Sequence, residues 1–206
     1  MILPAGETAR AKAAETISKG GVIAFRTDTF YGLGADPFSA AAVKRIRKLK
    51  GREENKPILL LISDHARVSR FITNQSALFV AVAKRFWPGP LTIVGRARHE
   101  LPEELTGGGG TIGLRLPDGE DVRVLVGACG GALTATSANP SGQSEARTAA
   151  QVRNYFPAGG IDLIIDSGDV TATKPSTVLD LSGSQPRLVR EGAILASELE
   201  AFVNDF

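Results

Sequence analysis

The pattern of hydrophobic and polar positions alternates between strand-like and helix-like segments. Short apolar runs bounded by glycine, proline or polar clusters predict buried strands, and apolar residues spaced three and four apart predict helices. The predicted strands are 22–25, 58–62, 91–94, 111–116, 133–136, 161–165, 176–181 and 188–190. The predicted helices are 8–18, 39–49, 64–72, 76–86, 120–129, 148–156 and one that begins at 197. Because the two kinds interleave without a long linker, we expect one α/β domain.

Polar residues at the helix starts are the expected caps. They are Thr8, Ser39, Asp64, Thr148 with Gln151, and Ser197 with Glu200. The consecutive strands 91–94 and 111–116 have no predicted helix between them. The sheet is therefore expected to be mixed rather than purely parallel.

Composition fits an ordinary globular domain, with 206 residues, 43% of them hydrophobic and 22% charged. The net charge of +2 gives no bulk electrostatic argument for nucleic acid binding. The lone Cys129 excludes an internal disulfide and fits a reducing compartment. The start lacks the pattern of a signal peptide, and no apolar run approaches the roughly 20 residues of a membrane helix. We expect a cytoplasmic protein without a membrane partner.

Three cations stand on the connection between helix 39–49 and strand 58–62. They are Lys50, Arg52 and Lys56. A mobile lysine and a fork-shaped arginine can neutralise a phosphate from different directions. A basic helix end that complements its own dipole, followed by solvated charges, explains the stretch equally well. On these residues alone, both interpretations stay open.

Polar clusters also follow two other predicted strands. Residues 27–34 supply hydroxyls and an aromatic phenol, and residues 137–142 supply small polar side chains and glycine. Open α/β sheets bind ligands at such strand ends. The alternatives are a turn in which Asp28 and Thr29 cap their own backbone, and a plain turn at 137–142.

Alternation along strand 111–116 places Gly113 and Arg115 together on the face opposite its apolar residues. A guanidinium above a glycine has room to bind a carboxylate, although an exposed charge on a half-solvated sheet is an equal explanation. For the stretches 174–180 and 187–192, strand entry with solvated charges is the stronger interpretation in isolation.

Several common site motifs are missing from the sequence. There is no Gly-x-x-x-x-Gly-Lys-Ser/Thr loop and no dinucleotide fingerprint in a strand–turn–helix context. His65 and His99 have no metal-ligand spacing, and Cys129 fits the core better than a nucleophile. Cations and hydroxyls at strand ends remain, and these suit electrostatic rather than covalent catalysis.

Taken together, a series of stretches resembles the YrdC-like family of threonylcarbamoyl-AMP synthases. The matching stretches are Thr27–Leu33, Lys50–Arg52, Lys56–Leu60, Trp87–Thr92, Gly113–Pro117, Thr136–Gly142, Pro175–Val178 and Val189–Gly192. They occur in the family's order and cover the chain from about Gly21 to Gly192.

The resemblance implies a single YrdC-like domain over residues 1–206, with a twisted mixed sheet flanked by helices around a concave, positively charged cavity. It implies a nucleotidyltransferase that joins L-threonine, bicarbonate or CO2, and ATP into threonylcarbamoyl-AMP and pyrophosphate. The product would serve the N6-threonylcarbamoyladenosine modification of tRNA through downstream threonylcarbamoyl-transferase proteins. Mg2+ is expected on the ATP phosphates, and tRNA is a further candidate partner.

The resemblance also assigns roles to particular residues. The expected catalytic residues are Lys50, Arg52, Ser137 and Asn139. The expected ATP contacts are Arg52, Lys56, Thr111, Ser137, Asn139 and Arg190. The expected threonine contacts are Thr29, Arg115, Ser176 and the backbone of Ala135. No residue is expected to bind a metal directly.

Two departures from the family are visible. Strand 58–62 lacks a histidine that some relatives carry near the threonine, and the chain ends at Phe206 without the extra C-terminal domain of longer members.

One alternative function is that of a non-catalytic RNA-binding module, which the small net charge disfavours. Another is a carbamoyl-adenylate-forming domain that uses carbamoyl phosphate, of the kind found beside zinc-finger modules in hydrogenase maturation proteins. The single cysteine disfavours that second alternative.

Overall fold

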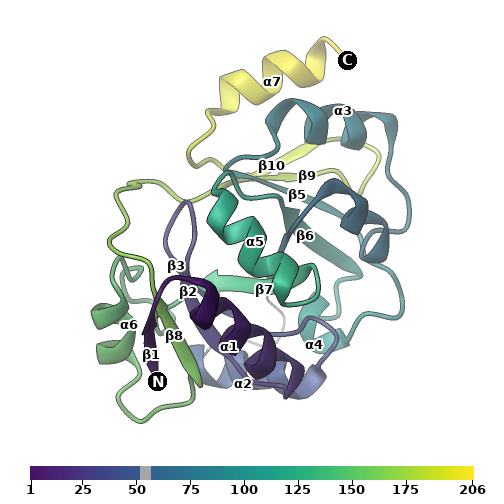
Figure 1. Cartoon of the computed structure of the whole chain (residues 1–206). Helices are drawn as coiled ribbons and strands as arrows, with labels where there is room; N and C mark the ends of the chain where they lie inside the picture. Colours follow the sequence, from purple (N-terminus) through teal and green to yellow (C-terminus); the bar gives the residue numbers. More distant parts are fainter. Residues whose placement is uncertain (52–56) are drawn as a thin grey trace.

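The fold is built on one mixed β-sheet, seen in a computed structural model that describes residues 1–51 and 57–206. Arg52 and Lys56, both expected at the site, lie outside the described residues. Ten strands follow one another across the sheet in the order β1-β8-β2-β3-β7-β4-β6-β5-β9-β10 in the described part of the chain. The expected α/β class is thereby confirmed (Figure 1).

The strands are short and are joined by both kinds of pairing. They are β1 (Ile2–Pro4), β2 (Ile23–Arg26), β3 (Tyr31–Gly34), β4 (Leu59–Ile62), β5 (Leu91–Arg96), β6 (Thr111–Arg115), β7 (Ala132–Ser137), β8 (Leu163–Asp166), β9 (Thr177–Asp180) and β10 (Arg187–Arg190). β8 pairs in parallel with β1 and β2, β4 with β6, and β5 with β9. The other neighbours are antiparallel, including β5 and β6, as the lack of a predicted helix between those two strands indicated.

Helices cover both faces of the sheet. They are α1 (Glu7–Ser18), α2 (Ala40–Lys50), the 3-10 helix η1 (His65–Arg70), α3 (Ala77–Phe86), α4 (Glu103–Thr106), α5 (Glu120–Ala128), α6 (Ala149–Tyr155) and α7 (Ala196–Asn204). α1 and α5 lie side by side across one face (Figure 1). Their apolar residues form one core cluster with the strands below them, and α2, α3 and α6 contribute to a larger cluster on the other face.

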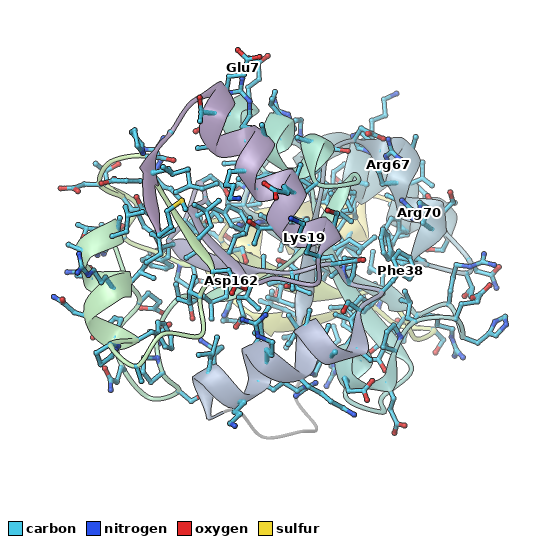
Figure 2. The ribbon with its side chains drawn as sticks, turned by 60° about the horizontal axis from the view of Figure 1, so that its bottom comes forward. Glu7, Lys19, Phe38, Arg67, Arg70 and Asp162 are labelled. Carbon is cyan, nitrogen blue, oxygen red and sulfur yellow. The ribbon has the colours of Figure 1, made fainter. Side chains whose placement is uncertain are left out.

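Two polar anchors fix connections between these elements. The Asp162 carboxylate accepts a hydrogen bond from the Val22 amide at 2.7 Å and pairs with Arg45 of α2 at 2.9 Å, which ties the start of β2 to α2. To the right of Asp162 in Figure 2, Arg70 lies beside Phe38, with its Cζ atom 5.3 Å from the ring centroid. That contact holds η1 against the connection that precedes α2.

Some of the predicted helix caps are confirmed. The Ser39 side chain accepts a hydrogen bond from the Ala42 amide at 3.3 Å, and α2 begins at the next residue. Thr148 accepts one from the Gln151 amide at 3.0 Å at the start of α6. Both are polar N-caps followed by helix-forming residues, so local sequence and final structure agree here.

Other predicted caps are wrong. α1 begins at Glu7, before Thr8, and α7 begins at Ala196, before Ser197. The Ala196 amide is satisfied instead by the Glu191 carboxylate at 3.1 Å. Asp64 precedes a 3-10 helix that ends at Arg70, and its carboxylate pairs with a side chain of that helix. At α7, a partner outside the expected capping motif therefore satisfies a helix-end amide.

β1, β3 and α4 were not predicted. β3 has the sequence Tyr31-Gly32-Leu33-Gly34, which lacks a continuous apolar run, and pairing with β2 and β7 makes it a strand. Gly34 is needed there, because a Cβ atom at this position would come within 2.7 Å of the Phe25 ring. Tertiary contact overrides local propensity at this strand.

Candidate active site

A cavity of about 360 Å³ opens on the same face of the sheet that α1 and α5 cover further along. Its floor includes residues of four neighbouring strands. They are Thr92 and Val94 of β5, Gly113 and Arg115 of β6, Leu59 of β4, and Ala135 and Ser137 of β7. Ile112 and Leu114 point to the core on the other face, so the alternation predicted for this strand is confirmed. A volume of this size suits a small ligand.

Arg115 is the most deeply buried charge on the cavity wall, with 3% of its surface exposed. Its Nη2 atom lies 3.1 Å from Asp28 Oδ1, and its Nη1 donates to Thr29 Oγ1 at 3.3 Å. Its Nε has no hydrogen-bond partner among the described residues. Burial lowers the pKa of the Arg115 guanidinium, the Asp28 carboxylate opposes this change, and the positive charge of Arg190 adds to it. Arginine stays charged under these conditions.

The turn after β2 is organised by Thr27. Its Oγ1 atom accepts hydrogen bonds from the amides of Thr29 at 3.1 Å and Phe30 at 3.2 Å. The same hydroxyl donates to the Phe30 carbonyl at 2.7 Å. The alternative in which Asp28 and Thr29 cap the backbone is therefore wrong, because Thr27 takes that role. Their side chains are left to contact Arg115.

Ser176 and Arg190 form the opposite wall. The Ser176 carbonyl accepts hydrogen bonds from Arg190 Nη2 at 2.8 Å and Nε at 3.2 Å, and its hydroxyl lies 3.1 Å from Thr92 Oγ1. Burial lowers the pKa of Arg190, and the nearby charge of Glu145, which also lines the cavity, opposes that change. Arg187 and Arg190 are both exposed, as the interpretation of 187–192 as solvated charge expects, but Arg190 also lines the cavity and is held by the Ser176 carbonyl.

Lys50 connects the end of α2 to the turn that follows β7. Its Nζ donates to the carbonyls of Ser137 at 2.5 Å and Asn139 at 2.8 Å, and its own carbonyl accepts the Ser141 amide at 2.8 Å. The two stretches therefore meet, as one shared site requires. Lys50 is 5% exposed and directs its ammonium at backbone carbonyls of the turn.

Asn139 stabilises the same turn from within. Its Nδ2 donates to the carbonyls of Pro140 at 3.0 Å and Gln143 at 2.6 Å. Its Oδ1 is buried and has no partner among the described residues. Because this oxygen is buried, Asn139 supports the turn through its Nδ2 donors rather than through Oδ1.

The described residues therefore divide the predicted site into two groups. The residues that line the cavity are Thr29, Arg115, Ala135, Ser137, Ser176 and Arg190. Lys50, Asn139 and Thr111 do not line it. Thr111 lies at the start of β6, opposite Arg96, at the end of the strand away from Arg115.

Sequence reasoning missed several lining residues. Thr92 could have been found, because it alternates with the buried Leu91 and Ile93 along β5. Glu145 carried no separate signal, and neither did Asp28, which lies behind Arg115 and does not line this cavity, since a single acid in a polar loop is usually solvated. Leu59 lines the cavity in the strand where some relatives carry a histidine, and Leu61 pairs with Arg115 across β4 and β6.

Two kinds of feature are absent from residues 1–51 and 57–206. No group of three or more His, Cys, Asp or Glu side chains is placed to hold a metal ion. None of the helices combines the length and the apolar character that crossing a membrane requires.

The fold and the cavity define an α/β protein with a mixed sheet and an arginine-lined hollow suited to small anionic ligands. The Sua5/YciO/YrdC family model, described as "Telomere recombination", matches residues 15–192. The chain therefore belongs to the Sua5/YciO/YrdC family.

Individual relatives agree with this assignment. The chain is 41% identical to a threonylcarbamoyl-AMP synthase of Thiobacillus denitrificans, over 81% of this chain and 87% of the relative. It is 36% identical to a threonylcarbamoyl-AMP synthase of Pyrococcus abyssi, over 94% of this chain but only 56% of that longer protein. The crystal structure of P. abyssi Sua5 complexed with L-threonine superposes with a TM-score of 0.94 at 33% identity, over 100% of this chain and 62% of the other.

Proposed function

We propose that this chain is an L-threonylcarbamoyladenylate synthase, a nucleotidyltransferase that converts L-threonine, bicarbonate or CO2, and ATP into threonylcarbamoyl-AMP and pyrophosphate. The observation that carries the proposal is the buried Arg115, which shares one cavity with Arg190 and with the hydroxyls of Thr29, Ser137 and Ser176. Relatives of this chain bear the name of that enzyme, and P. abyssi Sua5 has been crystallised with L-threonine.

Threonine is proposed to bind at the Arg115 end of the cavity. The guanidinium offers N–H groups to the substrate carboxylate, which matches its planar fork. Thr29 and Ser176 offer hydroxyls, and Ala135 offers backbone polar groups. Leu59 and Val94 supply an apolar wall for the methyl group in place of the histidine of some relatives.

ATP is proposed to lie along the turn after β7, with Arg190 on its other side. Lys50 and Asn139 hold this turn in shape, and Ser137 lines the cavity from it. Arg52, Lys56 and Thr111 belong to the same proposal by their places in the family motifs. Mg2+ enters with the triphosphate and neutralises part of its charge.

The chemistry follows from this arrangement. The neutral amine of threonine attacks CO2 and loses a proton, which gives a carbamate. A carbamate oxygen then bonds to the α-phosphorus of ATP as the bond to the bridging oxygen of pyrophosphate breaks. Negative charge grows on the phosphoryl oxygens and the leaving pyrophosphate, where fixed cations stabilise it. The cavity thus works by placement and electrostatics.

The wider setting is part of the same proposal. A single YrdC-like domain in the cytoplasm would pass its product to threonylcarbamoyl-transferase proteins, and the modified adenosine would lie in tRNA. The sign of the potential in the cavity and direct binding of tRNA stay predictions.

Release of pyrophosphate in bicarbonate buffer with Mg2+ and ATP tests the proposal. We expect release that depends on L-threonine, with threonylcarbamoyl-AMP as the product identified by mass. Equal rates without threonine would overturn the proposal. An arm with carbamoyl phosphate in place of threonine tests for carbamoyl-adenylate formation. A filter-binding arm tests for tRNA binding that falls steeply with salt.

Arg115→Lys probes the proposed contact with the threonine carboxylate, because it keeps the charge but removes the planar fork. We expect kcat/KM for threonine to fall about 100-fold, within the range for loss of a buried charged contact. Arg187→Lys is the matched control, since that exposed arginine of β10 pairs with Asp180, and the cavity lining does not include it.

A further inference from the structure

Asp28 lies against the deepest cation of the cavity yet is not exposed to the cavity itself. Its Oδ1 is 3.1 Å from Arg115 Nη2, and the two side chains are 13% and 4% exposed. Both Asp28 oxygens have less than 1 Å² of accessible surface and no hydrogen-bond partner that meets full geometry among the described residues. Asp28 therefore cannot touch a ligand directly, and its charge acts on the cavity through Arg115.

The turn that carries Asp28 is fixed independently of any ligand. The buried Thr27 hydroxyl accepts the amides of Thr29 and Phe30 and so sets the backbone between them. Asp28 and Thr29 then approach Arg115 at different nitrogens, Nη2 and Nη1. Two contacts at different nitrogens restrict rotation of the guanidinium plane, which a single contact would leave free.

The charges around Arg115 show why an acid is needed at this position. Burial and the positive charge of Arg190 both lower the pKa of Arg115, and Asp28 is the group that opposes them. A buried charge whose partner is removed is strongly destabilised. Without Asp28, the guanidinium would be free to turn toward solvent through the cavity mouth. It would then leave the place where a carboxylate meets it.

We propose that Asp28 is a positioning residue of the amino-acid subsite, which holds the Arg115 guanidinium in the plane that receives the substrate carboxylate. Arginine carries five N–H donors. Asp28 and Thr29 engage Nη2 and Nη1, and each of these nitrogens carries a second N–H, so donors remain for the α-carboxylate. That the amino acid is threonine rests on the proposed function.

The chain offers a matched control beside this pair. A second hollow of about 310 Å³ lies behind Asp28 and is lined also by Arg26 and Asp121. Asp121 pairs with Arg26 at 3.5 Å at the surface, away from Arg115. Asp121→Asn therefore makes the same chemical change as Asp28→Asn in the same hollow, without altering the guanidinium.

Calorimetric titration of the full chain with L-threonine, and separately with ATP, tests the inference. We expect Asp28→Asn to weaken threonine binding at least about tenfold and ATP binding less than about twofold. Asp121→Asn should leave both unchanged. Threonine binding by Asp28→Asn within twofold of wild type, or an equal loss for both ligands, would overturn the inference. If Asp28→Asn does not fold, Asp28→Glu keeps the charge and moves it by one methylene, and an intermediate loss for threonine alone is expected.

A double-mutant cycle separates positioning from a general structural effect. The Arg115→Lys variant has no planar guanidinium whose orientation Asp28 could fix. In this background, Asp28→Asn should therefore weaken threonine binding less than about threefold. Full additivity of the two losses would show that Asp28 acts by another route. Wild-type protein that binds threonine but releases no pyrophosphate would refute the proposed function and leave this binding comparison intact.

Discussion

The ammonium of Lys50 lies 2.8 Å from the carbonyl oxygen of Asn139, although 89 positions separate them in the chain. The contact makes the end of α2 and the turn after β7 one structural unit. A cation that was expected to face phosphate is instead bonded to two backbone carbonyls. Its charge still lies directly beneath the turn, where it makes the local potential more positive.

Lys50→Met should remove both the charge and the support of this turn. We expect pyrophosphate release to fall about 100-fold and the melting temperature to fall as well, because two buried carbonyls lose their donor. Lys48→Met is the control, since Lys48 is an exposed residue of the same helix. Steady-state kinetics and thermal unfolding check both effects. Unchanged kinetics with a lowered melting temperature would restrict Lys50 to a structural role.

Gly113→Ala should narrow the cavity floor without straining the backbone. A Cβ atom at this position would lie 2.9 Å from Thr92 Cγ2, so Thr92 must move and with it the hydroxyl pair that Thr92 makes with Ser176. We expect KM for threonine to rise about tenfold with KM for ATP little changed. Gly127→Ala is the control, because its Cβ would lie at an ordinary 3.7 Å from Ser63 Cβ.

Cys129 should be inert toward thiol reagents in the folded protein. Burial raises the pKa of its thiol to about 12, so almost no thiolate exists at pH 8. Iodoacetamide at pH 8 should label the native protein far more slowly than the urea-unfolded protein. Comparable labelling rates in the two states would contradict this expectation.

The same raised pKa predicts the sign of a stability change. The folded protein keeps the thiol proton between pH 9 and 12, whereas the unfolded chain loses it. The contribution of Cys129 to the free energy of unfolding is therefore complete below pH 9 and declines as the pH rises. Urea unfolding of wild type and Cys129→Ala at pH 8 and pH 10 measures it, and the difference between the two proteins should shrink at the higher pH.

Asp162→Ala should lower stability by about 2 kcal/mol, because a buried amide loses its acceptor and Arg45 loses its ion pair. Glu198→Ala is the comparison variant. It removes the acid of an exposed ion pair in which Glu198 lies 3.9 Å from Arg85, and it should change the free energy of unfolding by less than about 0.5 kcal/mol. Urea titration of both variants provides the comparison. Equal midpoints would show that Asp162 does not stabilise the start of β2.

Local sequence predicted the elements whose signal is local. The cap at Ser39 and the alternation that places Arg115 opposite Ile112 and Leu114 follow from neighbouring residues, and both are confirmed. β3 was not predicted, because its strand character comes from pairing with distant strands. The role of Thr27 was not predicted either. Three adjacent polar residues are compatible with several turn conformations, and only contact with Arg115 selects one of them.

The site likewise contains residues that local sequence predicted and residues that depend on distant contacts. Strand ends and family motifs led to Thr29, Ser176 and Arg190, which line one cavity. The inward direction of the Lys50 side chain could not be predicted, because it depends on carbonyls that the turn after β7 places beneath α2. Asp28 could not be singled out for a similar reason, since its partner lies 87 positions away on another strand.

The cavity draws Thr29 from the turn after β2 and Arg190 from the last strand, with β5, β6 and β7 between them. Its lining residues extend from Thr27 to Arg190, so no short fragment of the chain contains the whole binding surface. Catalytic turnover should therefore serve as a late reporter of assembly. During refolding, it should recover only when β10 has joined the edge of the sheet, after most of the circular dichroism signal has returned.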